Sequence, residues 1–259
     1  MIPAGFAGVE TMLATAMVAA IRPGAAFIAA PIFGANAVPV QLRLVVALGL
    51  ALPMMGRSAA ITPEVLLSLG GLLMVVQEIV IGVAIGSACQ LAYAAALMAG
   101  ETIGNAMGLG FAVMVDPLTS QQSNAVSQWM GVVATLIFLS VDGHLLLAAT
   151  IAESYRTLPV GGGLPGDFAG PVVALGSMLF AAGVAIAIPV ASAILLVQLC
   201  FAMLSRTAPQ LNLFAVGLPA SLMAGLLLFA IALPAMGDAI GEATERSLDR
   251  SATIAGQAL

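Results

Sequence analysis

Residues 64–100 read EVLLSLGGLLMVVQEIVIGVAIGSACQLAYAAALMAG, and this apolar stretch decides the fold. As one helix it would be about 55 Å long at a rise of about 1.5 Å per residue, whereas the hydrocarbon core of a bilayer is about 30 Å thick. The excess predicts either a bent hairpin or a helix that leaves the bilayer and stays buried in protein. Residues 168–204 form a second run of the same length, in which Pro189 offers a bending point because proline has no backbone donor.

The composition of the whole chain is that of a membrane protein. Apolar residues make up 61% of the chain and charged residues 7%, and the mean hydropathy is +1.14. A soluble domain could not bury this much apolar surface. The net charge of −5 gives no basic patch for nucleic acid. We therefore expect an all-α membrane protein with about six spans, in the apolar runs 11–30, 38–56, 64–100, 124–152, 168–204 and 211–237.

Small residues recur on one face of the third apolar run. At about 100° per residue, a helix would bring five glycines and one tyrosine into an arc of about 100° that starts at Glu78. These residues are Gly71, Gly82, Gly86, Tyr93, Gly100 and Gly104. Small residues let helix backbones approach closely in lipid, so this glycine stripe is predicted to face protein.

Four charged residues in apolar surroundings are expected to have partners. Glu78 lies deep in an apolar run and Glu101 lies near its end. An ionised carboxylate that faces lipid is costly, so either an interhelical or intersubunit contact or a proton or ion relay is expected. Arg22 and Arg206 raise the same question, and Glu78 or a carbonyl at a helix C-terminus could pair with either arginine.

Residues that could carry enzyme chemistry are sparse. Asp142 and His144 could supply two metal ligands, but the sequence places no other His or Cys nearby, so a helix cap or a buried hydrogen bond is expected instead. Cys89 and Cys200 lie in apolar runs and are interpreted as packed thiols. The sequence shows no nucleotide-binding fingerprint, nucleophile elbow or HExxH motif. We therefore predict no catalytic residue, metal or cofactor.

The connection after residue 100 is unusually apolar. Bulky Met and Phe side chains stand beside Gly108 and Gly110, which free the backbone, and Asp116-Pro117 predicts a turn. From the residues alone, the connection could be an ordinary re-entrant loop packed against its neighbours. It could also be a hydrophobic constriction of the kind that stops water and ions.

Five sequence motifs follow one another in a fixed order. They are RPGAAFIAAPIFG (22–34) followed by Pro39 and Arg43, QEIVIGVAIG (77–86), GETIGNAMGLGFAVMVDP (100–117), DGHLLL (142–147) and SRTAPQLNLFAVGLP (205–219). Together they resemble the FliR family of flagellar export-gate membrane proteins, whose virulence-secretion counterpart is the SctT family. The likeness covers about residues 10–237. One departure is the stretch at 40–42 before Arg43, where relatives often carry a further basic residue.

The resemblance implies a fold and a set of partners. It implies bent helical hairpins in which a FliP-like part (1–165), including a plug loop at about 106–122, is fused to a FliQ-like hairpin (166–237). A polar C-terminal tail (238–259) follows, which we expect to lie in water. Family members form a helical hetero-oligomeric ring with FliP-family and FliQ-family membrane proteins, and FlhB-family and FlhA-family export proteins dock on it. Unfolded flagellar substrates pass through that ring.

The resemblance also implies roles for individual residues. The loop would project into the channel and plug it through Met107, Gly108, Leu109, Gly110, Phe111, Met114, Asp116 and Pro117. The residues themselves, apart from the resemblance, predict a second set of roles. Helix-packing or interface residues would be Gly71, Glu78, Gly82, Gly86, Gly100, Glu101 and Gly104. Buried polar or structural residues would be Arg22, Arg43, Asp142, His144, Arg206, Gln210 and Asn212.

The expected function is that of a non-enzymatic subunit of the flagellar type III protein export gate. It would lie in the bacterial inner membrane at the flagellar basal body, with several passes through the lipid. Three alternatives stay open. They are a virulence-secretion homologue of the same gate, a proton-coupled transporter of small solutes or ions that uses Glu78 and Glu101, and an assembly scaffold that does not line a channel.

Overall fold

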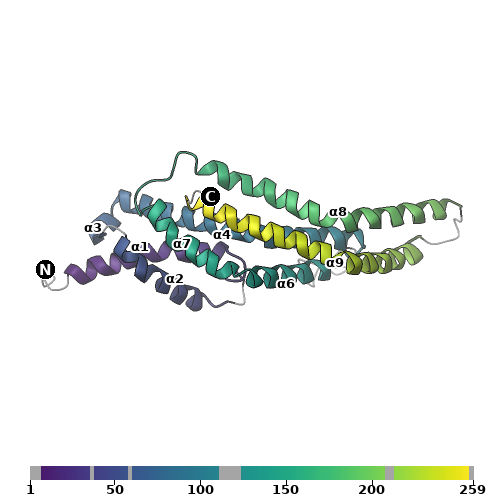
Figure 1. Cartoon of the computed structure of the whole chain (residues 1–259), viewed down its shortest axis with the longest axis horizontal. Coiled ribbons are helices and arrows are strands. Elements are labelled where there is room, and N and C mark those ends of the chain that lie inside the picture. The colour runs from purple at the N-terminus through teal and green to yellow at the C-terminus, as the bar shows by residue number, and fades with distance from the viewer. Residues whose placement is uncertain (1–6, 36–37, 58–59, 111–123, 208–212, 257–259) are drawn as a thin grey trace. The chain divides into compact units, whose positions relative to one another are not determined.

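The computed structural model describes residues 7–35, 38–57, 60–110, 124–207 and 213–256 (Figure 1). These residues form helices and connections, with no strand among them. The helices are α1 (Ala7–Ala29), α2 (Val40–Met54), the 3-10 helix η1 (Met55–Arg57), α3 (Pro63–Leu66), α4 (Leu69–Ala106), α6 (Ala125–Ser140), α7 (Gly143–Thr157), α8 (Ala169–Thr207) and α9 (Leu213–Ile254). The expectation of an all-α protein is confirmed for these residues.

Three helices are longer than one crossing requires. α4, α8 and α9 have 38, 39 and 42 residues, whereas a transmembrane helix needs about 20. α4 occupies most of the first overlong apolar run, whose residues 64–66 belong to α3, and α8 occupies the second, so neither run is a hairpin. Pro189 lies inside α8, and Pro219 and Pro234 lie inside α9. Such helices extend beyond the hydrocarbon layer unless they are strongly tilted.

The chain is a multi-pass membrane protein, with fewer spans than the sequence predicted. The described residues contain four helices that are long and apolar enough to cross a membrane, or five if α6 and α7 form one span. The predicted count of six is too high for two reasons. α2 has only 15 residues, and the apolar run at 124–152 is broken by a bend of 63° between α6 and α7. Asp142, at that bend, has a left-handed φ of 55°, which Asp tolerates better than most residues.

The chain divides into two compact units. The long helices α4, α8 and α9 each contribute residues to both units. Unit 1 comprises Met1–Leu91, Leu139–Gly176 and Glu245–Leu259, and unit 2 comprises Ala92–Phe138 and Ser177–Thr244. The core of unit 1 includes the fully buried side chains of Phe27, Ile81, Ile85, Leu147 and Ile151. The core of unit 2 is a cluster that includes Ile103, Met107, Met130, Ile194 and Ile240. The division into a FliP-like and a FliQ-like part follows other boundaries and stays a prediction.

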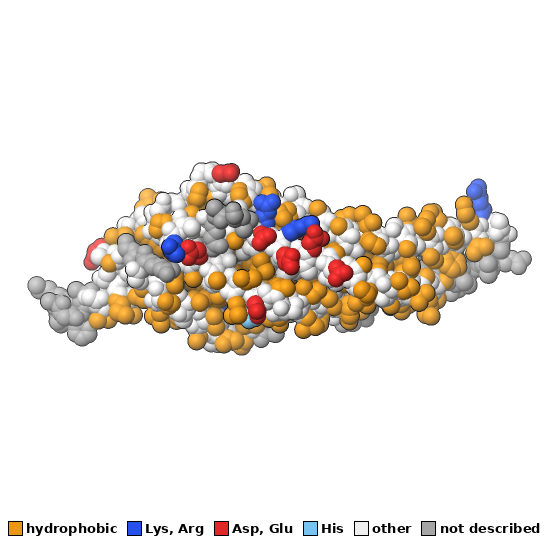
Figure 2. Space-filling view, in the orientation of Figure 1, with side chains coloured by type: hydrophobic (Ala, Val, Ile, Leu, Met, Phe, Trp, Pro, Cys, Tyr) orange, Lys and Arg blue, Asp and Glu red, His pale blue; other side chains and the backbone are white. Residues whose placement is uncertain are grey.

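The C-terminal segment is part of the folded structure, contrary to our expectation. α9 continues to Ile254, and Ser247, Ser251 and Ala255 are buried in unit 1. The Thr157 hydroxyl donates a hydrogen bond to the Ala255 carbonyl oxygen. Small hydroxyl side chains on one helix face allow close packing, while the charged residues lie on the exposed face; Figure 2 shows acidic and basic side chains gathered over this half of α9. We expected the whole segment to lie in water because of its charges, whereas the structure exposes the charged face and buries the hydroxyl face in unit 1.

Candidate functional site

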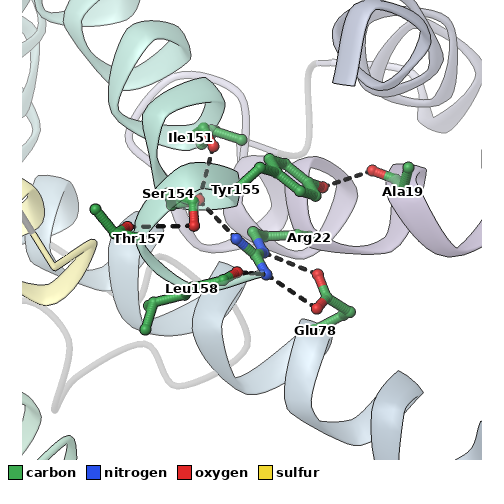
Figure 3. A network of polar contacts seen from close by, with 8 residues as sticks. All are labelled: Ala19, Arg22, Glu78, Ile151, Ser154, Tyr155, Thr157 and Leu158. Atoms are coloured by element: carbon green, nitrogen blue, oxygen red, sulfur yellow. Dashed lines mark hydrogen bonds and ion pairs between the residues drawn. The ribbon is translucent and has the colours of Figure 1, made fainter. Parts of the chain in front are cut away.

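A buried ion pair joins α1 to α4 in unit 1 (Figure 3). Arg22 Nε donates to Glu78 Oε2 at 2.8 Å, and Arg22 Nη2 donates to Glu78 Oε1 at 2.9 Å. Both side chains are fully buried. A two-pronged contact between a guanidinium and a carboxylate is one of the stronger hydrogen-bonding arrangements in proteins. The two charges therefore neutralise each other inside the unit.

α7 completes the surroundings of the arginine. Arg22 Nη2 also donates to the Leu158 carbonyl oxygen at 2.8 Å, and Nη1 donates to Ser154 Oγ at 2.9 Å. The Tyr155 ring centroid lies 4.1 Å from Arg22 Cζ, and the Tyr155 hydroxyl donates to the Ala19 carbonyl oxygen at 2.6 Å. Four of the five guanidinium N–H groups are thus satisfied. Of these partners, the sequence analysis named two, the Glu78 carboxylate and a carbonyl at a helix C-terminus.

The glycine stripe makes this contact possible. A Cβ atom on Gly82 would collide with the Arg22 carbonyl oxygen, and one on Gly86 would collide with the Ala26 carbonyl oxygen. Gly71 lies equally close to the carbonyl oxygens of the α3 segment. These glycines follow or precede Glu78 by whole helical turns, so α1 can approach α4 closely enough to bury Arg22.

The stripe continues in unit 2, where it packs against the start of α6. A Cβ atom on Gly100 would lie 2.8 Å from Ser127 N, and one on Gly104 would collide with the Asn124 side chain. At all five glycines of the stripe, an added Cβ atom would therefore meet other protein atoms. The sequence predicts the stripe from helical periodicity alone.

Glu101 accepts hydrogen bonds from Asn124, the residue just before α6. Its carboxylate accepts hydrogen bonds from Asn124 N at 3.1 Å and from Asn124 Nδ2 at 2.9 Å. Asn124 Oδ1 accepts in turn from Ser127 N at 2.9 Å, which caps the first turn of α6. The interhelical hydrogen bond is therefore the interpretation of Glu101 that these contacts favour.

α4 ends on a left-handed glycine. Gly108 has a φ of 88°, Gly108 N donates to Asn105 O at 3.0 Å, and Leu109 N donates to Gly104 O at 2.9 Å. This pair of hydrogen bonds is the usual helix ending in which a glycine follows the last turn. We expected Gly108 to free the backbone, whereas in the structure its missing side chain permits one defined cap.

The remaining predicted residues are placed as follows. Four loop residues, Phe111, Met114, Asp116 and Pro117, and two residues after α8, Gln210 and Asn212, lie outside the described residues. Arg206 is exposed near the end of α8, so the described residues do not bury it as the sequence predicted. Arg43 is half-buried, and its Nη2 donates to the Ala35 carbonyl oxygen at 2.6 Å.

Asp142 and His144 stand at the start of α7 without forming a side-chain cap. Asp142 occupies the N-cap position, but its side chain makes no capping hydrogen bond. Its carbonyl oxygen accepts from Leu145 N and Leu146 N. His144 Nδ1 is buried and has no hydrogen-bond partner among the described residues. Within the same ranges, no group of three His, Cys, Asp or Glu could hold a metal ion.

Several residues that contribute to these contacts escaped the sequence analysis. Ser154 and Tyr155 come to Arg22 from a helix more than 130 residues away, and periodicity within α4 could not identify them. Gln198 and Ser221 contact the end of α4 from α8 and α9. Gln198 had a usable signal, because it is an isolated amide inside an apolar run.

Comparison with known proteins agrees with the motifs. The chain is 36% identical over 175 residues, or 64% of each chain, to the flagellar biosynthetic protein FliR of Pectobacterium carotovorum subsp. carotovorum. It is 35% identical over 212 residues to FliR of Escherichia coli strain K12, covering 79% of this chain and 78% of that protein. It is 32% identical over 216 residues to FliR of Caulobacter vibrioides, covering 82% and 85%. A family model described as bacterial export proteins, family 1, matches residues 13–247, and the chain therefore belongs to the FliR family of bacterial export proteins.

Proposed function

We propose that the chain is a non-enzymatic core subunit of the flagellar type III protein export gate. In this proposal it assembles with FliP-family and FliQ-family membrane proteins in the bacterial inner membrane, at the basal body. FlhB-family and FlhA-family proteins act on the same complex, and unfolded flagellar subunits pass through it. The family membership supports the flagellar assignment, since the relatives are named flagellar biosynthetic proteins.

The observation that carries the assembly proposal is the exposure of two overlong apolar helices. Within the chain, only 28% of an 18-residue apolar stretch of α8 is buried, and only 17% of the corresponding stretch of α9. Both helices are about twice as long as one crossing needs. Lipid can cover only part of such a surface, and we infer that neighbouring membrane subunits cover the rest.

We also propose that the loop at about 106–122 plugs the channel. Both of its ends are firmly held in unit 2, by the glycine cap at Gly108 and by the contact between Asn124 and Glu101. A loop with fixed ends can present its bulky apolar residues at one place, where a hydrophobic constriction excludes water and ions.

The plug has a direct test in the assembled complex. We expect the double substitution Phe111→Gly and Met114→Gly to raise ion leak across the membrane severalfold when the whole complex is expressed, because it removes two bulky loop side chains. Leu67→Gly, which changes an exposed side chain in the turn between α3 and α4, serves as the control. An unchanged leak in the loop variant, with normal complex yield, would rule out the plug.

The transporter alternative is not favoured. It needs Glu78 and Glu101 to bind and release protons, but Glu78 is fully buried against Arg22 and Glu101 is held by Asn124. The virulence alternative is not favoured either, since the relatives carry flagellar names.

Deleting the gene should abolish filament assembly and the secretion of hook and filament proteins, and the gene in trans should restore both. Normal flagella in the deletion strain would contradict the flagellar assignment.

A further inference from the structure

Two carbonyl groups at the end of α4 receive donors from other helices. The cap at Gly108 uses the carbonyls of Gly104 and Asn105, and Met107 N donates to Ile103 O at 2.9 Å. Among the described residues, no backbone N–H group of α4 donates to the carbonyl of Ala106 or Met107. A carbonyl without a partner is costly in apolar surroundings, so a donor from elsewhere is expected.

Gln198 of α8 supplies the shorter of the two contacts. Its Nε2 donates to the Ala106 carbonyl oxygen at 2.7 Å. Ser221 Oγ of α9 lies 3.4 Å from the Met107 carbonyl oxygen, but it also lies 2.9 Å from the Leu218 carbonyl oxygen. A hydroxyl has a single proton, so Ser221 contributes less than Gln198.

The side chain of Met107 fixes the same point by packing. It is 1% exposed and belongs to the core of unit 2. It packs against α9 at Gly225, which has no side chain. A Cβ atom added there would lie 2.5 Å from Met107 Cγ and 3.1 Å from Met107 Cε. The end of α4 is thus held by a hydrogen bond from α8 and by a packing contact with α9.

We propose that Gln198 is a positioning residue for the segment that follows α4. By holding the Ala106 carbonyl against α8, it sets the direction in which residues 108–110 leave the helix. Gln198 is exposed within the chain, on a largely apolar helix, and in lipid or against other membrane subunits an unpartnered amide there would be unfavourable. The inference rests on the proposed function only in that the segment concerned is the one to which we assign the plug.

The test uses a cysteine probe at Leu109 in the complete, membrane-embedded complex. Leu109 is partly buried against the core of unit 2. The background carries Cys200→Ser, because Cys200 is exposed, whereas Cys89 is buried and can remain. Into the Leu109→Cys chain we introduce Gln198→Leu, which removes the amide, or Gln198→Asn, which keeps an amide but shortens it by one methylene. Gln77→Leu is the matched control, because Gln77 Nε2 is buried without a hydrogen-bond partner among the described residues.

The readout is the rate at which the probe thiol introduced by Leu109→Cys reacts with N-ethylmaleimide at equal complex yield. Both Gln198 variants should increase this rate by about two- to tenfold, the factor that one neutral hydrogen bond is worth, while Gln77→Leu should not change it. A purely structural role would lower complex yield without a selective change at the probe thiol. Equal rates in the parent and in both Gln198 variants, or an equal rise in the Gln77 variant, would overturn the proposal.

Ion leak separates this proposal from the plug, and it is measured on Gln198→Leu with Leu109 and Cys200 restored. If Gln198→Leu raises both the reaction rate of the probe thiol and the leak, both proposals are supported. If only the reaction rate rises, Gln198 positions the segment but the plug assignment fails. If neither rises while the loop variant at Phe111 and Met114 leaks, the plug stands and the role of Gln198 is rejected.

Discussion

Arg22 shows how a single residue can organise a unit inside an apolar protein. A buried guanidinium must find partners for its N–H groups, and here they come from α4 and α7. Buried ion pairs often add little net stability, because desolvating both charges offsets their attraction. Removing one partner is far more costly, since the other charge is then left buried alone. We therefore expect the pair to fix which helix surfaces meet, more than it adds to stability.

The buried pair can be tested at the scale of single residues. Glu78→Ala should destabilise the chain by about 3–5 kcal/mol, because it leaves the Arg22 charge buried without a counter-charge. The double variant Arg22→Met and Glu78→Leu should recover most of that loss, since both charges are then absent. The measurement is thermal unfolding of the purified complex.

An exposed ion pair provides the control for this prediction. Arg156 Nη1 lies 3.3 Å from Glu153 Oε1, and the two side chains are 63% and 40% exposed, respectively. Glu153→Ala should change stability by less than about 1 kcal/mol, because solvent screens such pairs. If Glu78→Ala were as mild as Glu153→Ala, the buried pair would not organise unit 1.

At the scale of the elements, close helix packing depends on the glycine stripe of α4. Gly82→Ala should destabilise the chain by about 1–3 kcal/mol through overpacking, since the added methyl group would meet the Arg22 backbone. Gly49→Ala in α2 is the matched control, because an added Cβ there meets nothing within 4 Å. It should leave stability unchanged or raise it by up to about 1 kcal/mol through helix propensity. The measurement is the midpoint of thermal unfolding of each variant. If Gly82→Ala and Gly49→Ala shifted the midpoint equally, Gly82 would have no special role in packing.

The last turns of α9 give a second prediction at this scale. A chain that ends at Thr244 should fail to accumulate in the membrane, because it loses the buried contacts of Ser247, Ser251 and Ala255 with unit 1. Removal of residues 257–259 alone is the control and should be tolerated. Membrane levels measured by immunoblotting compare the two truncations. Normal accumulation of the shorter chain would show that this part of α9 is dispensable.

The elements also show which features a sequence can predict. The stripe and the partner of Arg22 followed from helical periodicity and from the cost of charges in lipid, both of which act within a few turns. The number of spans did not follow, because a hydropathy run carries no information on the left-handed turn at Asp142. The cap at Gly108 was misread for a related reason, since a glycine allows either freedom or one fixed left-handed conformation. Contacts from Ser154 and Gln198 depend on tertiary packing, which one sequence does not reveal.

At the scale of the whole molecule, the central claim is that this chain is completed by other membrane proteins. Its overlong helices carry large apolar side chains that the chain itself leaves exposed, including Phe180, Leu196 and Met203 on α8 and Met223 and Ile231 on α9. Figure 2 shows hydrophobic side chains over much of the visible surface. Lipid alone would have to cover helices about twice as long as one crossing requires.

The mass of the detergent-solubilised particle tests this claim most directly. We predict that native mass spectrometry after co-expression with FliP-family and FliQ-family proteins from the same genome finds one copy of this chain with several copies of each partner. Expressed alone, the chain should be recovered poorly and as heterogeneous aggregates. A stable, homogeneous monomer that associates with neither partner would contradict the account.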